Sequence, residues 1–295
     1  MASILFDHYA KIYLDFKRHE LKVSTFDKYE KIVENRLLPV FSGRAVTDIR
    51  PSDVKHWLYS LVDVSGKTKR HYLGVLSGIL QEALFDEIIE KNPVKFVRLP
   101  KVQKPVIRPF TSDQVKALLD DAENFNYRHF LAVAFFTGMR SGEIIALKRQ
   151  DIDLDRRLIR VERSRSKHGE TTPKTLTSIR DVPIINTLRP YLDELLKPNG
   201  SEYLFVNQYG DPYRDTHCFI YNHWRPALER LGIEYRRLYN TRHTFATNML
   251  YRNLVSPVQL AQILGHANTQ MVYDVYVSYV TQWYRDFDRT IEIYV

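Results

Sequence analysis

The chain has 295 residues, enough for two domains of ordinary size, and 44% of them are hydrophobic while 26% are charged. Cys218 is the single cysteine, which excludes a disulfide framework, leaves little basis for a cysteine-based zinc site and fits a reducing intracellular setting. The N-terminus carries charges where a signal peptide would be apolar. No stretch approaches the roughly 20 apolar residues of a membrane-spanning helix.

The formal net charge is +8, from 43 Lys and Arg residues against 35 Asp and Glu residues. An excess of this size favours a polyanionic partner, although many basic proteins have none. Residues 1–98 carry 16 basic against 13 acidic residues and the remainder carries 27 against 22, so neither half is a basic tail. If the partner is a nucleic acid, we expect both halves to contact it.

Residues 1–98 have the apolar spacing of helices. Four helical segments are predicted, namely FDHYAKIYLDFKRH, VSTFDKYEKIVENRLLPVF, RPSDVKHWLYSLV and GKTKRHYLGVLSGILQEALFDEII. Ser24 and Ser52 are candidate N-caps, Pro39 is expected to end the second helix, and an Asn-Pro pair is expected to end the fourth. Short connections between the helices favour a compact all-α domain.

Residues 99–108 are predicted to be a linker, because the stretch around them is rich in proline and has no periodicity. Lys101, Lys104 and Arg108 either follow a phosphate backbone or are solvated linker residues, and their spacing does not decide between the two. The remaining residues, 109–295, are predicted to form the second domain with a C-terminal tail.

The second domain is predicted to combine helices with a small antiparallel sheet. TSDQVKALLDDA is a helix capped by Thr111 or Ser112, and FLAVAFFTGMRSGEIIAL is an apolar helix broken at TGMRSGE. RLIRVERSRSKHGETTPKTLTSIRDVPI has the short alternating runs of strands. Further helices are expected at THCFIYNHWRPALERLG, NTRHTFATNMLYRN, SPVQLAQILGH and the final tyrosine run. The predicted fold class is therefore mainly α with a small antiparallel β-sheet.

Two arginines lie where a helix would bury them. Arg140 stands between two glycines after an apolar helix, and it pairs either with an internal carboxylate such as Glu143 or with an anionic ligand. Arg242 and His243 open another apolar helix, whose N-terminus favours anions. The alternative there is an N-terminal cap followed by a surface arginine.

A lysine, a histidine and three tyrosines complete the candidate set. Lys174 lies beside a strand turn, where a lysine is usually solvated, and His266 follows Gly265 at a helix end, a common capping arrangement. Arginines clamp phosphate oxygens, a lysine protonates a leaving alkoxide and a tyrosine attacks phosphorus. No cluster with metal-ligand spacing accompanies them, so neither metal nor other cofactor is expected. The candidate nucleophiles are Tyr273, Tyr276 and Tyr279.

Four segments in this order resemble the tyrosine recombinase (phage integrase) family: TGMRSGEIIALKRQDID, PKTLTSIRDVPI, YNTRHTFAT and LGHANTQMVYDVYVSY. Each is weakly specific alone, but the order, ending in a tyrosine just past LGH, is specific. The resemblance covers essentially the whole chain. It implies a helical, SAM-like core-DNA-binding domain over 1–98, the linker, and a mixed α/β catalytic domain over 109–295.

The resemblance also implies roles for individual residues. Arg140 and Arg242 match the two phosphate-clamping arginines, and Glu143 matches the carboxylate that supports the first. Lys174 matches the hairpin lysine that acts as general acid toward the 5′-hydroxyl. His266 matches the His/Trp position that hydrogen-bonds the scissile phosphate.

Tyr239 departs from the family pattern, which usually has a histidine three residues before the second arginine and assigns it as the general base. Since the unperturbed pKa of tyrosine is about 10, Tyr239 is expected to donate a hydrogen bond to the phosphate. His243 is expected to point elsewhere on the helix and is not assigned a role.

In the family the nucleophile follows the His/Trp position by nine or ten residues. Tyr276 lies ten residues after His266 and is the predicted nucleophile. Tyr273 is too close, Tyr279 is too far, and both are expected to be packing residues on the same side of the helix.

The implied function is site-specific DNA recombination through a covalent 3′-phosphotyrosine, without metal or ATP, for a phage, a mobile element or chromosome resolution. The implied partners are double-stranded recombination sites, three further copies of the chain on paired sites, and accessory DNA-bending or directionality factors. Without DNA the chain is expected to be a monomer or weakly associated, in the cytoplasm, away from membranes and close to the nucleoid. The predicted DNA-contacting residues are Lys67, Lys69, Arg70, Lys101, Lys104 and Arg108.

Three alternatives remain at this stage. A DNA-binding protein on the same scaffold without catalysis is favoured only by Tyr239. A relaxing enzyme similar to a type IB topoisomerase would act without paired sites. A helical scaffold without a DNA role would show no salt-sensitive DNA affinity.

Overall fold

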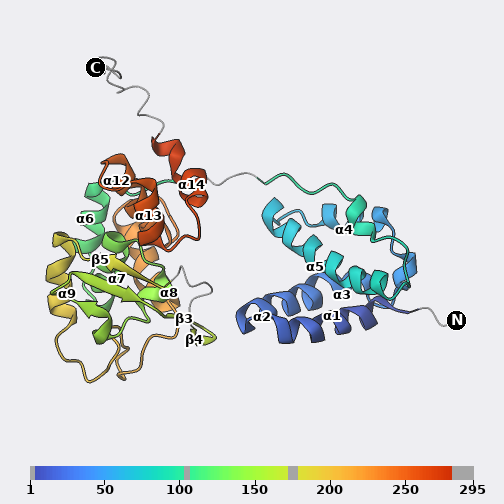
Figure 1. The fold of residues 1–295 in the computed structure, drawn as a ribbon, viewed down its shortest axis with the longest axis horizontal. Helices are drawn as coiled ribbons and strands as arrows, with labels where there is room; N and C mark the ends of the chain where they lie inside the picture. Colours follow the sequence, from blue (N-terminus) through green and yellow to red (C-terminus); the bar gives the residue numbers. More distant parts are fainter. Residues whose placement is uncertain (1–3, 103–106, 172–178, 281–295) are drawn as a thin grey trace, which may run out of the picture. The chain divides into compact units, whose positions relative to one another are not determined.

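The computed structural model describes residues 4–102, 107–171 and 179–280, with side chains up to Tyr276 in the last of these ranges. In these ranges the chain is mainly helical with a small antiparallel sheet, which confirms the predicted fold class (Figure 1). The chain separates into two compact units, Met1–Pro105 and Val106–Val295. None of the described helices is both long and apolar enough to cross a membrane.

The first unit is a group of helices around its own apolar core. The buried side chains of Phe6, Leu37 and Leu76 are part of this core, and α1 packs along α5. Its helices are α1 (Phe6–Glu20), α2 (Val23–Ile32), the π-helical η1 (Val33–Leu37), α3 (Leu38–Phe41), the 3-10 helix η2 (Val46–Asp48), α4 (Pro51–Ser60), α5 (Gly66–Phe85) and the 3-10 helix η3 (Pro93–Phe96).

Pro39 does not end the second helical segment, which continues to Phe41. The π-helical turn η1 precedes the proline, which then stands in the first turn of α3. A proline at that position loses no intrahelical hydrogen bond, so the chain stays helical. Ser24 is also not an N-cap, because α2 already begins at Val23.

Ser52 is not an N-cap either. α4 begins at Pro51, and its entry is fixed by Asp53, whose carboxylate accepts the Arg50 backbone N–H at 2.8 Å. The fourth predicted helix, α5, ends at Phe85, earlier than the Asn-Pro pair that was expected to stop it.

The second unit surrounds a small sheet with helices, as predicted. Its core brings together apolar side chains of α7, β2 and β5, such as Phe130, Ile159 and Val182. Thr111 is the N-cap of α6, in a capping box with Gln114. The helices are α6 (Ser112–Asp120), α7 (Phe125–Thr137), α8 (Ser141–Ile144), α9 (Arg189–Leu195), α10 (His217–Phe219), the π-helical η7 (Ile220–Trp224), α11 (Arg225–Arg230), α12 (Asn240–Tyr251), α13 (Pro257–Leu264) and α14 (Gln270–Val280), with the 3-10 helices η4 (Arg149–Asp151) and η6 (Asn186–Leu188).

The sheet has the strand order β1-β2-β5, and both pairings are antiparallel. Val161 of β2 pairs with Arg180 at the start of β5, and β5 packs against α13. The sheet therefore delivers an arginine to the end of α13. The strands are β1 (Ile152–Asp153), β2 (Leu158–Val161) and β5 (Arg180–Pro183), and a separate hairpin joins β3 (Ser164–Ser166) to β4 (Gly169–Thr171).

Gly138 ends α7 in the left-handed conformation, at φ +64°. A Cβ atom built there would lie 2.5 Å from the Phe245 ring of α12. Glycine is therefore required at this position for two reasons, the backbone angle and the close approach of α12. The break lets the chain turn so that α8 begins directly after Arg140.

We predict that Gly138→Ala destabilises the protein more than Gly232→Ala. Both glycines have φ +64°, but nothing lies within 4 Å of a Cβ at Gly232. Strain in the left-handed region costs roughly 1–2 kcal/mol at either position, and crowding against Phe245 adds about 1–3 kcal/mol at Gly138 alone. Urea unfolding of the two variants measures the difference, and equal losses would contradict this assignment.

Candidate active site

Among the described residues of the second unit, Arg242 is the most buried charged side chain, at 1% exposed. Its Nη1 donates to the Gly138 carbonyl at 2.8 Å and its Nη2 donates to the Leu264 carbonyl at 2.7 Å and to His266 Nε2 at 2.9 Å. Burial lowers the pKa of Arg242 to about 10. The expected alternative of a surface arginine is therefore wrong.

The charge of Arg242 is balanced by dipoles and not by a carboxylate. Gly138 and Leu264 lie at the C-terminal ends of α7 and α13, where the helix dipole is negative. In the described part of the chain no carboxylate forms an ion pair with Arg242, and its Nε is buried without a hydrogen-bond partner. Because no opposite charge pairs with Arg242 there, an anionic ligand would stabilise the buried guanidinium.

The contact with Arg242 fixes the tautomer of His266. A guanidinium only donates, so Nε2 of His266 accepts and the proton of the neutral ring lies on Nδ1. Nδ1 is buried and has no partner among the described residues. Burial, together with the charges of nearby arginines, lowers the pKa of His266 to about 4. Gly265, at φ +65°, caps α13, so the expected capping arrangement is present beside this contact.

Glu143 holds two arginines from opposite sides. Its carboxylate accepts from Arg140 Nη1 at 2.7 Å, from the Arg140 backbone N–H at 2.9 Å, and from Arg180 Nη2 at 2.8 Å. Burial alone would raise the pKa of Glu143, but the hydrogen bonds and charges of Arg180 and Arg140 outweigh it, so the pKa lies below its usual value. The internal ion pair expected between Arg140 and Glu143 is therefore present, and the Arg140 side chain stays 37% exposed.

Arg180 was missed in the sequence, although its pattern carried a signal. It alternates with Val182 and Ile184, which are buried on the inner face of the sheet, so its side chain had to be buried as well. Its Nε donates to the Ile263 carbonyl at 2.6 Å. Arg180 therefore ties Glu143, and through it Arg140, to the end of α13.

Tyr276 is 2% exposed, and burial raises its pKa above the usual value. Its hydroxyl lies 3.0 Å from His243 Nδ1, so the expectation that His243 points away from the site was wrong. Tyr239 is 43% exposed, and its ring meets that of His243 edge-on, with 5.0 Å between centroids. Tyr273 is 48% exposed, so the expectation that it is a packing residue was also wrong.

Several predicted residues are not part of this cluster. Lys174 and Lys104 lie outside the described residues. Arg108 is exposed and forms an ion pair with Glu234 at 2.7 Å. Lys101 is exposed in the stretch before residue 103.

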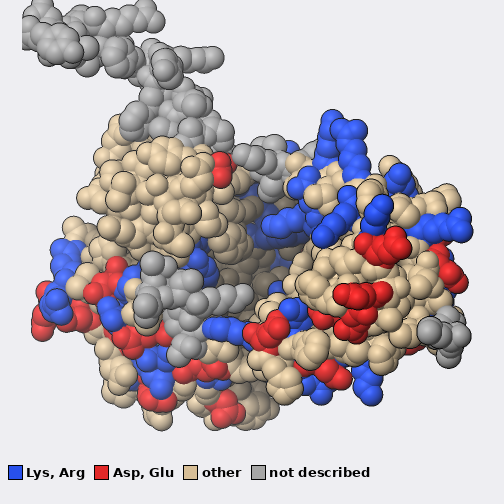
Figure 2. All heavy atoms as spheres, turned by 45° about the vertical axis from the view of Figure 1, so that its right-hand side comes forward, with Lys and Arg blue, Asp and Glu red and all other residues tan. Residues whose placement is uncertain are grey.

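The basic residues at the start of α5 lie on the surface of the first unit. Lys67 and Arg70 are exposed and Lys69 is half-buried, and Arg70 Nε donates to the Pro100 carbonyl at 2.8 Å. Figure 2 shows that, on this unit, Lys and Arg side chains gather on part of the visible face, while Asp and Glu cluster next to them. On the second unit charges of both signs are interspersed.

The residues that the structure describes include no group of three or more His, Cys, Asp or Glu side chains that would hold a metal ion.

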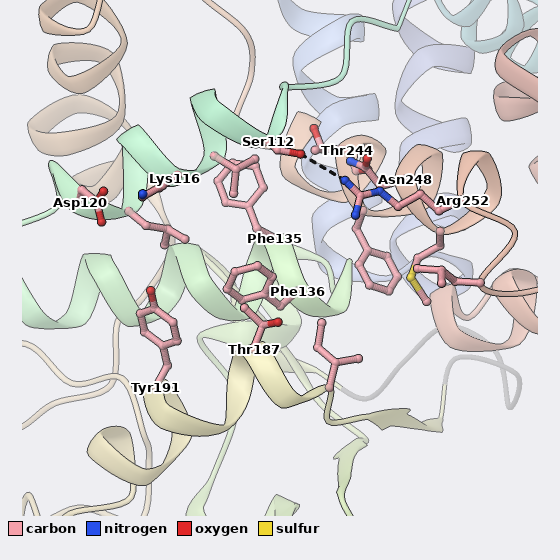
Figure 3. A pocket seen from close by; sticks show the side chains of 16 residues that line it. Ser112, Lys116, Asp120, Phe135, Phe136, Thr187, Tyr191, Thr244, Asn248 and Arg252 are labelled. Atoms are coloured by element: carbon pink, nitrogen blue, oxygen red, sulfur yellow. Dashed lines mark hydrogen bonds between the residues drawn. The ribbon is translucent and has the colours of Figure 1, made fainter.

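Residues of α12 from Thr244 to Arg252 also line an apolar cavity of about 500 Å³. Figure 3 shows Thr244, Asn248 and Arg252 on one side of it and Phe135 and Phe136 of α7 on another. None of the candidate catalytic residues lines this cavity. α12 therefore presents Arg242 and His243 to one site and a different set of side chains to a separate hollow.

A helical unit joined to a mixed unit, in which arginines, a histidine and a tyrosine converge, defines the class of tyrosine recombinases. The sequence profile of the phage integrase family matches residues 108–282, and the profile of the phage integrase N-terminal SAM-like domain matches residues 5–62. The chain therefore belongs to the phage integrase family and is a tyrosine-type site-specific DNA recombinase.

Individual relatives agree with this assignment. The chain is 30% identical over 272 residues to a protein of Mycobacterium tuberculosis described as a prophage phiRv2 integrase, covering 89% of this chain and 71% of that protein. It is 26% identical to a XerC-like tyrosine recombinase of Caldanaerobacter subterraneus, covering 89% and 76%. The fold is similar to that of the Tn1549 transposon integrase in complex with a circular intermediate DNA, with a TM-score of 0.77, 20% identity and coverage of 95% and 99%. It is also similar to lambda integrase solved as a tetramer on a Holliday junction, with a TM-score of 0.75, 19% identity and coverage of 90% and 79%.

We predict that the buried pair of Glu143 and Arg180 is strongly coupled. Arg180→Met leaves the Glu143 carboxylate buried with one arginine fewer and should lower the free energy of unfolding by about 3–5 kcal/mol. Combining Glu143→Gln with Arg180→Met should cost clearly less than the sum of the two single changes. Urea unfolding of the four proteins tests this, and additive losses would show that the two side chains do not depend on each other.

Proposed function

We propose that Tyr276 is the nucleophile of the recombination reaction and that Arg140, Arg242 and His266 bind the phosphate it attacks. The observation that supports this most directly is the convergence of these groups from the N-cap of α8, from α12, from the turn after α13 and from α14. Arg242 contacts His266, and Arg140 Nη2 reaches the carbonyl of the neighbouring Gly265 at 3.3 Å. The Tyr276 pKa is raised by burial and lowered by the charge of Arg242, so this hydroxyl lies within the field of the cluster.

The phosphate supplies what the cluster lacks. Its nonbridging oxygens accept from Arg140 and Arg242, which stabilise the charge that develops as the nucleophile attacks. The Nδ1–H of His266 and the Nε–H of Arg242, which have no partners among the described residues, are further donors for it. A buried cation without a carboxylate is thus explained by a ligand that brings its own negative charge.

The chemistry is an exchange of phosphodiesters. Tyr276 Oη forms a bond to phosphorus, the bond from phosphorus to the 5′-oxygen breaks, and a 3′-phosphotyrosyl link and a 5′-hydroxyl result. Attack by the hydroxyl of another strand reverses the sequence. We assign the proton for the leaving oxygen to Lys174, on the strength of the family resemblance alone. Because Tyr276 is 2% exposed, we infer that α14 shifts when DNA binds.

We further propose that residues 1–98 form a core-DNA-binding domain, 99–108 the linker and 109–295 the catalytic domain. Lys67, Lys69 and Arg70 follow Ser65, the N-cap of α5, and a helix N-terminus favours phosphate. The chain is proposed to act as a homotetramer on paired sites, in the cytoplasm, where accessory DNA-bending factors would assist it.

We predict that Tyr276→Phe abolishes covalent attachment to DNA, while Tyr273→Phe retains it. A nicked suicide duplex carrying the junction sequence that flanks the gene in its source genome traps the intermediate, because the cleaved strand loses the fragment needed for rejoining. The readout is a denaturant-resistant protein–DNA adduct formed in the presence of EDTA. An adduct in the Tyr276→Phe protein would refute the assignment of the nucleophile, and loss in both variants would point to disruption of α14.

We predict that Lys67→Ala weakens DNA binding at all sequences and reduces its salt dependence. Loss of one phosphate contact lowers the slope of log affinity against log salt by about 0.9. The matched control is Lys31→Ala, since Lys31 is also a helical lysine of the first unit but pairs with Asp27 at 2.9 Å. Fluorescence anisotropy at several salt concentrations gives both slopes, and an unchanged slope for Lys67→Ala would exclude this residue from the interface.

A further inference from the structure

His243 is the group that lies against the hydroxyl of the proposed nucleophile. Its Nδ1 is 3.0 Å from Tyr276 Oη, and the two rings are 5.7 Å apart between centroids. The distance is within the range in which a base takes a proton from the group it activates. Tyr239, at the position where the family usually has a histidine, meets the His243 ring edge-on and is exposed.

We propose that His243 is the general base that accepts the proton of the Tyr276 hydroxyl when this tyrosine attacks the phosphate. The inference rests on the proposed function, in which Tyr276 is the nucleophile. It assigns the acid–base work of the absent histidine to a residue four positions further along, on the first turns of α12. Tyr239 is then left to donate its hydroxyl to the phosphate or to solvent.

The surroundings of His243 keep its ring neutral, which is the protonation state that a base requires. Burial, and then the charge of Arg242, lowers the pKa of His243 to about 4, so the ring is neutral at neutral pH. In the tautomer with its proton on Nε2, the neutral ring accepts the hydrogen bond of the Tyr276 hydroxyl through Nδ1. When a phosphate binds Arg242, its negative charge offsets the cation that depresses the basicity of His243. The base is therefore strengthened in the complex that needs it.

The groups facing His243 come from three segments. Tyr276 faces it from α14, Tyr239 precedes α12, Arg242 is its neighbour on α12, and His266 lies within its field from the turn after α13. No acidic side chain is among them in the described part of the chain. The site can therefore hold a positive imidazolium only while an anion is bound.

The proton and electron pairs balance through the step. The Tyr276 O–H bond breaks, its proton goes to His243 Nδ1, and the oxygen forms its bond to phosphorus. The 5′-oxygen leaves with the electron pair of the broken bond and takes a proton from the general acid. In the rejoining step the imidazolium returns its proton to the Tyr276 oxygen.

The test is His243→Gln, which keeps a hydrogen-bonding side chain but cannot take a proton. We expect the single-turnover rate of adduct formation on saturating suicide duplex to fall by about a hundredfold to ten-thousandfold, the usual share of general base catalysis. DNA affinity should stay unchanged. The rate of the variant should rise with hydroxide concentration across neutral pH, whereas the rate of the unsubstituted protein should change little there.

The matched control is His223→Gln. His223 is also half-buried against a tyrosine, with its ring 4.8 Å from that of Tyr127, but it lies away from the cluster. This control should react like the unsubstituted protein. If His243→Gln does not fold, His243→Ala is measured in the same way.

Two outcomes would overturn the inference. An unchanged rate in His243→Gln would exclude any role for the ring, and a reduced rate with the pH dependence of the unsubstituted protein would make His243 a structural support of Tyr276. Both leave the proposed function intact, because the unsubstituted protein still forms the adduct and Tyr276→Phe does not. Failure of the unsubstituted protein itself to form an adduct would instead contradict the proposed function.

Discussion

The buried guanidinium of Arg242 is the constraint on which the rest of the second unit depends. A cation that is 1% exposed must find acceptors, and here they are the carbonyls at the ends of α7 and α13 and the ring of His266. Both helices therefore have to end at this point, and both do so through glycines in the left-handed conformation, Gly138 and Gly265. The convergence of three helices is thus set by the hydrogen-bonding needs of one side chain.

The buried pair of Glu143 and Arg180 supports this arrangement without neutralising the charge of Arg242. Glu143 binds Arg140 and Arg180, and Arg180 is itself anchored to α13. The Glu143 carboxylate is therefore already occupied by two arginines. Among the described residues Arg242 meets helix-end carbonyls and His266 but no opposite charge, which is the condition that a phosphate site requires. Such unbalanced charge lowers stability in the absence of DNA, a compromise common at functional sites.

Sequence patterns predicted this architecture where the cause was local. The Thr111 cap, the break at Gly138, the alternating strands and the pairing of Arg140 with Glu143 all depend on neighbouring residues. The π-helical turn before Pro39 was not predicted. The sequence suggested only that a proline ends the helix before it, whereas this turn lets the chain remain helical past Pro39.

Contacts between distant elements were the part that escaped. Helical spacing gave the wrong expectation that His243 points away from the site, because it carried no information that α14 packs against α12 and brings Tyr276 to the His243 ring. The role of Arg180 was missed for the same reason, because its hydrogen bond to the Ile263 carbonyl depends on the packing of β5 against α13. The resemblance to a family supplied the proposed reacting groups, while contacts such as those of Arg180 and His243 became visible only in three dimensions.

The most direct measurement tests whether the charge of Arg242 interacts with the charge of the scissile phosphate, by removing each charge alone and both together. In the Tyr276→Phe background, the affinity for a duplex with a neutral methylphosphonate at the cleavage position is compared with that for the ordinary duplex. The comparison is then repeated after Arg242→Met. The account predicts that removing the phosphate charge weakens binding clearly when Arg242 is present and little when it is absent, because the two charges balance each other. Equal losses in both proteins would contradict the claim that the buried arginine is reserved for the scissile phosphate.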